Sequence, residues 1–201
     1  MEPFKNLQAV AVPVDAANVD TDQIIPARFL WKQRKDGYGE LLFNDVRLGS
    51  DKTPKPDFVL NRPEYRGARI LVAGRNFGCG SSREHAVWAL YDAGFRSVIA
   101  PSFGDIFYNN CFQNGLLPIV LPTERVATLI GRLTAQPGAA LTIDLPAQTV
   151  TGPDGVVDGF EIGAFRKACL LEGHDEVSFT LTHADRIAAF ERRHEARLPW
   201  V

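Results

Sequence analysis

The chain is organised around one glycine-rich run, Gly74-Arg75-Asn76-Phe77-Gly78-Cys79-Gly80-Ser81-Ser82-Arg83-Glu84-His85. Residues 68–73, just before it, are apolar and include β-branched side chains, which predicts a buried strand. Residues 86–94 follow with apolar side chains at helical spacing and end at a glycine, which predicts a helix. The run is therefore predicted to be the loop between a strand and a helix.

The composition of this loop is typical of an anion-binding site. Its three glycines permit positive φ angles and leave room for a ligand to approach the backbone. Ser81 or Ser82 is predicted to cap the helix, whose free amides and dipole favour an anion. Arg83 adds a planar fork that can hold a carboxylate or phosphate through two hydrogen bonds. We expect the loop to hold a small anionic solute.

Length and charge narrow the class of protein. A chain of 201 residues, 45% hydrophobic and 23% charged, is expected to form one globular domain. The net charge of -2, spread along the chain, argues against nucleic acid or an anionic membrane as a partner. No apolar run approaches the ~18 residues of a membrane span, and the first residues lack a signal-peptide core, so we expect a cytoplasmic protein.

The order of predicted elements indicates an α/β fold. Strands are expected at 68–73, 97–100 and 116–121, and helices at 86–94, 103–112 and 123–133. This alternation is typical of parallel strands joined by crossover helices. Short strands at 140–145, 148–151 and 156–162, separated by turn residues, predict an antiparallel meander.

Two C-terminal helices are predicted after the meander. One covers residues 164–172 and stops at a glycine, and the other begins near Thr182 and runs to about Arg197. In the last helix we expect Ile187, Ala188 and Phe190 to face the body of the protein. The charged residues are expected to face solvent: Glu191, Arg192, Arg193, Glu195 and Arg197.

The N-terminal part carries a second polar run. Residues 9–14 predict a strand, and five polar residues then lie between Asp15 and Asp22, before an apolar Ile-Ile-Pro segment. Turn and helix-cap chemistry explains this polarity, and so does a carboxylate that points into a site. Residues 28–55 combine aromatic, basic and glycine residues, which suggests a mobile surface loop able to close over a ligand.

Several common motifs do not match the central loop. It lacks the Gly-x-Gly-x-x-Gly of dinucleotide sites, the lysine of a Walker loop and the Gly-x-Ser-x-Gly of a nucleophile elbow. Cys79 is either a nucleophile at a helix N-terminus or a small side chain in a tight loop. The other cysteines, Cys111 and Cys169, are too widely spaced for a Cys-x-x-Cys cluster element or a disulfide framework. Glu84 and His85 fit helix capping as well as acid-base chemistry.

Three segments together resemble a known family. They are Gly78-x-Gly80-Ser81-Ser82-Arg83-Glu84-His85, Asp20-Thr21-Asp22-Gln23-Ile24-Ile25-Pro26 and Ala100-Pro101-Ser102-Phe103-x-Asp105-Ile106-Phe107. They resemble the swivelling domain of the aconitase superfamily, and within it the small-subunit family of 3-isopropylmalate dehydratase. The resemblance covers nearly the whole chain. It implies one three-layer β/β/α swivelling domain over residues 1–201, with a C-terminal helical extension from about residue 163.

The same resemblance implies a partner and a reaction. A separate large subunit would carry a [4Fe-4S] cluster, so this chain itself would bind no cofactor or metal. The open iron would act as a Lewis acid on the leaving hydroxide. Water would be removed from 2-isopropylmalate and re-added to give 3-isopropylmalate, in leucine biosynthesis.

The resemblance also implies roles for individual residues. Ser81 would be the base that removes a proton next to a substrate carboxylate, and Asp22 would be a second catalytic group. Residues that would bind the substrate are Ser82 and Arg83 at its carboxylates and Leu30 and Trp31 at its isopropyl group. Supporting positions behind them would be Glu84, His85 and Cys79, which replaces the acidic residue of aconitase-type domains.

Two other functions stay open at this level. One is the small subunit of a homoaconitase-like enzyme, whose substrate carries an extra carboxylate that Arg28 or Arg34 would bind. The other is a stand-alone domain that binds an anion without catalysis. An assay with 2-isopropylmalate and with the acid that carries the extra carboxylate distinguishes the homoaconitase-like enzyme from the dehydratase. Co-purification with a cluster protein distinguishes a subunit from a stand-alone domain.

Overall fold

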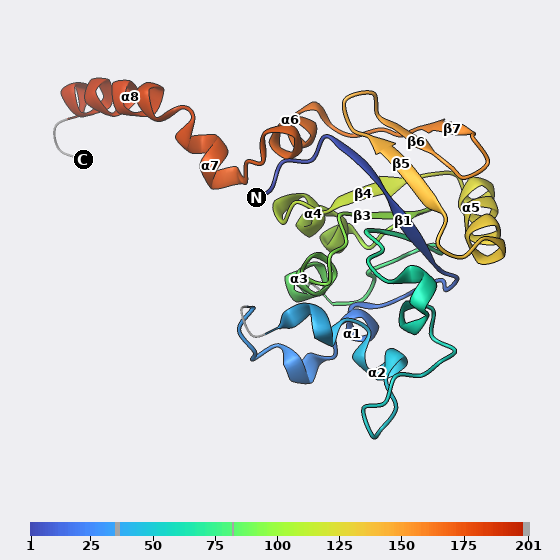
Figure 1. Cartoon of the computed structure of the whole chain (residues 1–201). Coiled ribbons are helices and arrows are strands. Elements are labelled where there is room, and N and C mark those ends of the chain that lie inside the picture. The colour runs from blue at the N-terminus through green and yellow to red at the C-terminus, as the bar shows by residue number, and fades with distance from the viewer. Residues whose placement is uncertain (35–36, 82, 199–201) are drawn as a thin grey trace.

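The fold is a seven-stranded sheet with helices packed on it, shown in Figure 1. The computed structural model of the chain describes residues 1–34, 37–81 and 83–198. The strands are β1 Asn6–Val14, β2 Ile70–Ala73, β3 Ser97–Ala100, β4 Leu117–Val120, β5 Ala140–Asp144, β6 Thr149–Thr151 and β7 Val157–Gly159. The α-helices are α1 Thr21–Ile24, α2 Asn44–Arg47, α3 Glu84–Asp92, α4 Asp105–Gln113, α5 Thr123–Ala135, α6 Ala164–Glu172, α7 Glu176–Leu181 and α8 Ala184–Arg197. Four short 3-10 helices lie between α1 and β2: Ala27–Phe29, Tyr38–Leu41, Val59–Asn61 and Pro63–Tyr65.

Strand β1 joins two different halves of the sheet. The strand order is β4-β3-β2-β1-β5-β6-β7. The C-terminal part of β1 pairs with β2 in parallel, from Ala11 opposite Ile70 to Val14 opposite Ala73. Its N-terminal part pairs with β5 in the antiparallel sense, with Asn6 opposite Asp144. The long first strand therefore couples the parallel α/β half to the antiparallel meander.

The parallel half is buried on both faces. All four residues of β2 are fully buried, and they alternate between two hydrophobic cores. Leu71 and Ala73 face a core that includes residues of α3 and α4, whereas Ile70 and Val72 face a core shared with α5 and the meander. Meander, parallel strands and helices therefore form three layers, and the predicted β/β/α class is confirmed.

The predicted element order is largely confirmed. The strands and helices from β2 to α6 lie within a few residues of their expected positions, and α6 has the predicted bounds. The predicted strand at 156–162 is shorter, and the sequence reading missed α7 because its six residues lack a long apolar repeat. Among the helices that the structure describes, none has the length and apolar character required to cross a membrane.

The segment expected to be a mobile loop is a packed lobe in the structure. Tyr38, Leu42 and Phe43 are almost fully buried in the core under α3. Arg34 donates to both carboxylate oxygens of Asp92 on α3, at 2.7 to 3.1 Å. Three apolar anchors and a bidentate ion pair therefore hold the described part of residues 28–55 against the helix that follows the central loop.

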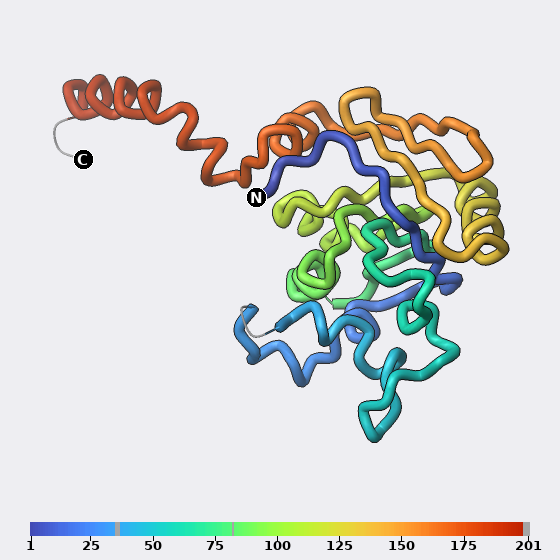
Figure 2. Tube along the Cα trace, in the orientation of Figure 1, coloured from blue at the N-terminus to red at the C-terminus, as the bar shows by residue number. Residues whose placement is uncertain are grey.

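The N-terminus and α6 are fastened together on the body, as the tube in Figure 2 shows. The Met1 ammonium donates to the Gly173 carbonyl at 2.8 Å, and the Phe4 amide donates to Leu170 at the same distance. Beyond Gly173 the chain leaves the body, and α8 extends away from it (Figure 1). No residue of α8 is buried, so the expectation that one face of this helix packs on the body is wrong. Amphipathic spacing predicted the helix but not what it packs against.

An ion-pair network on α5 leads to a prediction about acid stability. Arg125 donates to Asp154 and Asp158 in the β6–β7 hairpin, at 2.6 Å each, and these side chains are mostly buried. Hydrogen bonds from Arg125 lower the pKa of Asp154 to about 2, so the ionised carboxylate stabilises the folded state above its ordinary pKa of 3.8. That contribution is lost as the pH falls from 3.8 through 2.

We therefore expect Asp154→Asn to lower the free energy of unfolding at pH 7 by about 1 to 2 kcal/mol. The difference from the unsubstituted chain should shrink below pH 4. Urea unfolding at several pH values measures both effects, with exposed Asp57→Asn as a control that should change neither. Equal stability of Asp154→Asn and the unsubstituted chain at pH 7 would contradict this assignment.

Candidate functional site

The glycine-rich loop lies where three parallel strands end. It follows β2 and is held between the segments that follow β1 and β3. On one side, Gly78 donates its amide to the Val19 carbonyl at 2.7 Å. On the other side, the Phe77 amide donates to Ser102 at 3.1 Å, and Gly104 donates back to Phe77 at 2.9 Å. The loop is thus fixed at the carboxyl edge of the parallel sheet, where α/β folds commonly place their ligands.

Two asparagines fix the turn that leaves β2. Asn18 and Asn76 both have positive φ, at 56° and 58°, a conformation that asparagine tolerates better than most residues. The Asn76 side-chain amide donates to the Asn18 oxygen at 2.9 Å, and the Asn76 backbone amide donates to the Ser102 hydroxyl at the same distance. The side chains of Asn18, Asn76 and Ser102 thus hold the loop from both sides.

Gly78 is required by both its conformation and its surroundings. Its φ is +70°, and an added Cβ would lie 2.2 Å from the ring of Phe107 on α4. We expect Gly78→Ala to destabilise the fold by about 2 to 4 kcal/mol and to displace the loop. Gly131→Ala is the matched control, because its Cβ would meet no atom within 4 Å in the middle of α5, where alanine favours the helix.

Thermal unfolding and activity of the two alanine variants test this requirement. Gly78→Ala should lose both stability and activity, while Gly131→Ala should keep both. A Gly78→Ala chain as stable and active as the unsubstituted one would show that the loop is not constrained as described.

Ser81 is exposed at the end of the loop, and its backbone is fixed. The buried hydroxyl of Thr21 donates to the Ser81 carbonyl at 3.1 Å, and the Arg83 amide donates to the same carbonyl at 2.9 Å. The Thr21 amide donates to Cys79 at 2.9 Å. The residue that was predicted to be the base is therefore open to a ligand while its main chain is held from beneath.

Arg83 and Asp22 form the charged pair of the site, although they are 61 positions apart in the sequence. The Arg83 guanidinium donates to Asp22 Oδ1, and the Ala27 amide donates to the same oxygen at 3.2 Å. The hydrogen bond from Arg83, together with its charge, lowers the pKa of Asp22. Only 17% of the Arg83 side chain is exposed, compared with 56% of Asp22, so Arg83 is the more buried partner.

The helix cap differs from the prediction. Helix α3 begins at Glu84, and its N-cap is Arg83 in an extended conformation with no side-chain cap. Ser81 is therefore not the cap, which leaves its hydroxyl uncommitted to the first turn. Ser82, predicted to be a cap or a substrate ligand, lies outside the described residues. In contrast, the capping chemistry suggested for the Asp15 to Asp22 run is confirmed, because Asp20 and Gln23 form a capping box on α1.

Glu84 and His85 join α3 to its neighbours. Glu84 accepts a hydrogen bond from the Asn114 side chain at 2.8 Å, and Asn114 accepts one from Trp88 at 2.9 Å. The His85 ring lies 4.5 Å from that of Trp88 and 6.0 Å from that of Tyr38. Both residues therefore brace the helix that starts at the site.

The cysteines of the chain do not fit an iron-sulfur cluster. Cys79 is partly exposed on the loop, Cys111 is buried on α4, and Cys169 is buried on α6. Burial raises the pKa of the Cys111 thiol well above its ordinary value, which opposes the thiolate form that metals bind. Within residues 1–34, 37–81 and 83–198, no group of three or more His, Cys, Asp or Glu side chains is placed to hold a metal ion.

The residues expected to contact the substrate side chain, Leu30 and Trp31, lie on the lobe of residues 28–55. Leu30 is half-buried behind the 3-10 turn Ala27–Phe29, whereas Trp31 is 79% exposed. Two of the three arginines of the lobe have acidic partners. Arg28 pairs with Asp45, and Arg34 pairs with Asp92. These two arginines are therefore already engaged by carboxylates.

The sequence reading missed the residues that support the loop. Thr21 was visible only as a polar residue between two aspartates, although its hydroxyl fixes Ser81. Asn18 and Asn76 gave a signal as residues that accept positive φ, but their pairing depends on the fold. Asn114 is 30 positions beyond Glu84 and could be found only from the structure.

Known proteins match this chain along its whole length. Residues 1–124 match the aconitase C-terminal domain family, residues 127–164 match LeuD_N, and residues 178–201 match the C-terminal domain family of the 3-isopropylmalate dehydratase small subunit. The 3-isopropylmalate dehydratase small subunit of Paramagnetospirillum magneticum is 53% identical over the full length of both chains. The chain belongs to the family of 3-isopropylmalate dehydratase small subunits. The family predicted from the central loop is thereby confirmed.

Two further comparisons agree with this family. The small subunit of Methylibium petroleiphilum is 52% identical, and the match covers all of this chain and 97% of that one. The crystal structure of 3-isopropylmalate dehydratase from Methanocaldococcus jannaschii superposes with a TM-score of 0.65 at 27% identity. That superposition covers 92% of this chain and 99% of the other, so the three-layer fold is common to both.

Proposed function

We propose that this chain is the small subunit of a hydro-lyase that converts 2-isopropylmalate into 3-isopropylmalate during leucine biosynthesis. Two observations support this proposal. The chain is 53% identical to a named small subunit over its full length, and Ser81 is exposed near the Arg83–Asp22 pair. The reaction moves a hydroxyl group between neighbouring carbons by loss and re-addition of water. Such a reaction needs a base at carbon and a group that binds carboxylates.

Ser81 is the proposed base. Its deprotonated oxygen would take the proton from the carbon next to a substrate carboxylate, and the resulting hydroxyl would return a proton during hydration. A serine hydroxyl is a weak acid, so its anion needs nearby positive charge, which the Arg83 guanidinium and the positive end of the α3 dipole can supply. The Thr21 hydrogen bond engages the Ser81 carbonyl, so it keeps this residue in place without using the side-chain hydroxyl.

Arg83 is the proposed carboxylate ligand, and Asp22 orients it. An arginine held from one side by a carboxylate keeps its other donors in a fixed plane for a substrate carboxylate. Arg83 lowers the pKa of Asp22 from an ordinary value that is already acidic, so the aspartate is ionised at neutral pH and the pair persists into mildly acidic solution. Ser82 is proposed as a second carboxylate ligand, and Leu30 and Trp31 as contacts to the isopropyl group.

The cluster is proposed to belong to the large subunit. The three cysteines described in this chain lie on separate elements, which supports placing the [4Fe-4S] group on the partner. When bound there, it would supply a Lewis acid for the leaving hydroxide. This chain would supply the base and the carboxylate ligands that face it.

The alternative functions receive less support. A homoaconitase-like enzyme needs a cation for the extra carboxylate, but Arg28 and Arg34 are bound to Asp45 and Asp92. A stand-alone anion-binding domain does not explain why the relatives are small subunits.

The free cysteines are consistent with the reducing cytoplasm, where we place the protein. We treat the chain as one swivelling domain whose helical extension leaves the body after α6.

Reconstitution tests the proposed function. The chain is combined with the cluster-bearing large subunit of the same organism and assayed with 2-isopropylmalate and, separately, with homocitrate. We expect no turnover by the chain alone, turnover of 2-isopropylmalate by the mixture, and at least tenfold lower kcat/KM with homocitrate. A mixture that prefers homocitrate, or a chain that is fully active alone, would contradict the proposal.

A further inference from the structure

The C-terminal arm, α7 and α8, is ordered but uncovered. The ring of Phe179 on α7 packs edge-on against Phe165 of α6 at 4.9 Å and against His183 at 5.3 Å, which fixes the elbow between the helices. No residue of α7 or α8 is buried, and Figure 1 shows α8 extending away from the sheet. Phe190 and Ile187 are 59% and 40% exposed. Such a helix gains little from its own chain, which points to a partner.

Charge and apolar character are segregated around α8. Arg186, Phe190, Arg193 and Arg197 follow one another at intervals of four, three and four residues, so they share one face. Ile187 and His194 border Phe190 on the same side, and the His194 ring stacks on that of Phe190 at 5.6 Å. We call these six residues the cationic face. The acidic residues of the helix lie elsewhere on its circumference: Asp185, Glu191 and Glu195.

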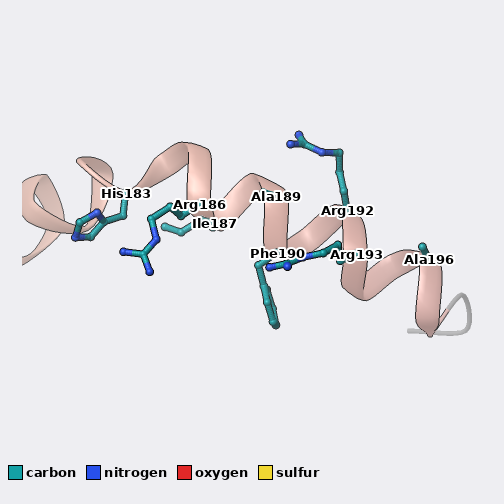
Figure 3. Close-up of a pocket in the computed structure, with 8 residues that line it drawn as sticks. All are labelled: His183, Arg186, Ile187, Ala189, Phe190, Arg192, Arg193 and Ala196. Atoms are coloured by element: carbon teal, nitrogen blue, oxygen red, sulfur yellow. The ribbon is translucent and has the colours of Figure 1, made fainter.

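Figure 3 shows this arrangement from the side. Phe190 points away from the helix with Arg193 beside it, whereas the guanidinium of Arg192 points to the opposite side. The residues labelled there come only from His183 and α8, so no other described element contributes to this surface. An exposed aromatic residue flanked by arginines is the composition of an interface centre.

We propose that the cationic face of α8 docks on an acidic, partly apolar surface of the large subunit. This inference rests on the proposed function, which requires such a partner, and it assigns the contact to a part of the chain remote from the loop. Phe190 would fill an apolar hollow, and Arg186, Arg193 and Arg197 would pair with carboxylates around it. The arm would then hold the two chains together without taking part in the reaction.

Charge disfavours the other candidates for this surface. In a symmetric contact between two copies of the chain, the arginine-rich faces would meet one another and repel. A lipid surface is a poor fit, because α8 offers two large apolar side chains and the whole chain has a net charge of -2. An acidic protein surface satisfies both the charge and the aromatic residue.

Titration of the full-length chain into its large subunit tests this contact. The half-saturating concentration is read from turnover of 2-isopropylmalate, and association is measured independently by calorimetry. We expect Phe190→Ala and Arg193→Glu each to raise the half-saturating concentration at least tenfold with unchanged kcat at saturation. Arg192→Glu makes the same charge change on the opposite face and should stay within twofold of the unsubstituted chain.

Several results would overturn the docking proposal. If the unsubstituted chain forms an active enzyme and Arg193→Glu associates as tightly as Arg192→Glu, only the docking proposal fails. If the unsubstituted chain does not associate with the large subunit, the proposed function fails with it. Self-association that Arg193→Glu abolishes would assign the face to a second copy, and binding to anionic vesicles with unchanged affinity for the large subunit would assign it to a membrane.

Discussion

Ser81→Ala should lower kcat of the reconstituted enzyme by roughly 10²- to 10⁴-fold, the effect expected when a general base is removed. The substitution deletes the hydroxyl that is proposed to accept the proton, while the backbone contacts of Ser81 to Thr21 and Arg83 remain. Affinity for the large subunit should therefore be unchanged. Because the residue is exposed, the free energy of unfolding should shift by no more than about 0.5 kcal/mol.

Steady-state kinetics at saturating large subunit measure the effect of Ser81→Ala. The exposed Ser50 offers a matched control, since Ser50→Ala makes the same chemical change outside the glycine-rich loop and should leave kcat unaltered. Turnover of Ser81→Ala within threefold of the unsubstituted enzyme would remove this residue from the role of base.

Arg83→Ala should lower kcat/KM by roughly 10²-fold, equivalent to about 3 kcal/mol of transition-state stabilisation. The guanidinium is proposed to bind a substrate carboxylate through charge-assisted hydrogen bonds and to stabilise the Ser81 anion. Arg83→Lys should recover only part of the loss, because an ammonium group is a point charge without the planar fork. Kinetics over a range of 2-isopropylmalate concentrations separate the effects on KM and kcat.

The same variant gives an independent signal at Asp22. Since Arg83 lowers the pKa of this carboxyl, Arg83→Ala should raise it toward its ordinary value of 3.8. Carboxyl chemical shifts followed by NMR during an acid titration detect the change, with Asp57 as an exposed reference. Unchanged kinetics together with an unchanged Asp22 titration would show that the pair does not exist in solution.

Local patterns predicted the parts of the fold that depend on neighbouring residues. The apolar runs of β2, β3 and β4 and the glycine that ends α6 were sufficient to place these elements. The prediction that α8 packs on the body was wrong. An amphipathic pattern shows only that one face of a helix avoids water, and a partner chain can cover that face as well as the body can. The sequence of residues 28–55 suggests a mobile loop because the buried anchors of this lobe, such as Tyr38, are single residues without a repeating pattern.

The candidate site was predictable to the extent that its residues share one segment. Ser81 and Arg83 lie in the glycine-rich run, and the similarity to small subunits added Asp22. The contact between Asp22 and Arg83 spans 61 positions, and the hydrogen bond from Thr21 to Ser81 spans 60. Such contacts depend on β1 and β2 lying side by side in parallel, which no local pattern specifies.

Proton transfer at carbon is the step that tests the role of Ser81 most directly. The reconstituted enzyme is incubated with 2-isopropylmalate in heavy water, and deuterium at the exchangeable carbon of the recovered acids is measured by mass spectrometry. If Ser81 is the base, the unsubstituted enzyme should incorporate deuterium at a rate close to turnover, and Ser81→Ala should incorporate at least 10²-fold less while still binding substrate. Equal incorporation by the two enzymes would contradict the assignment of the base to this chain.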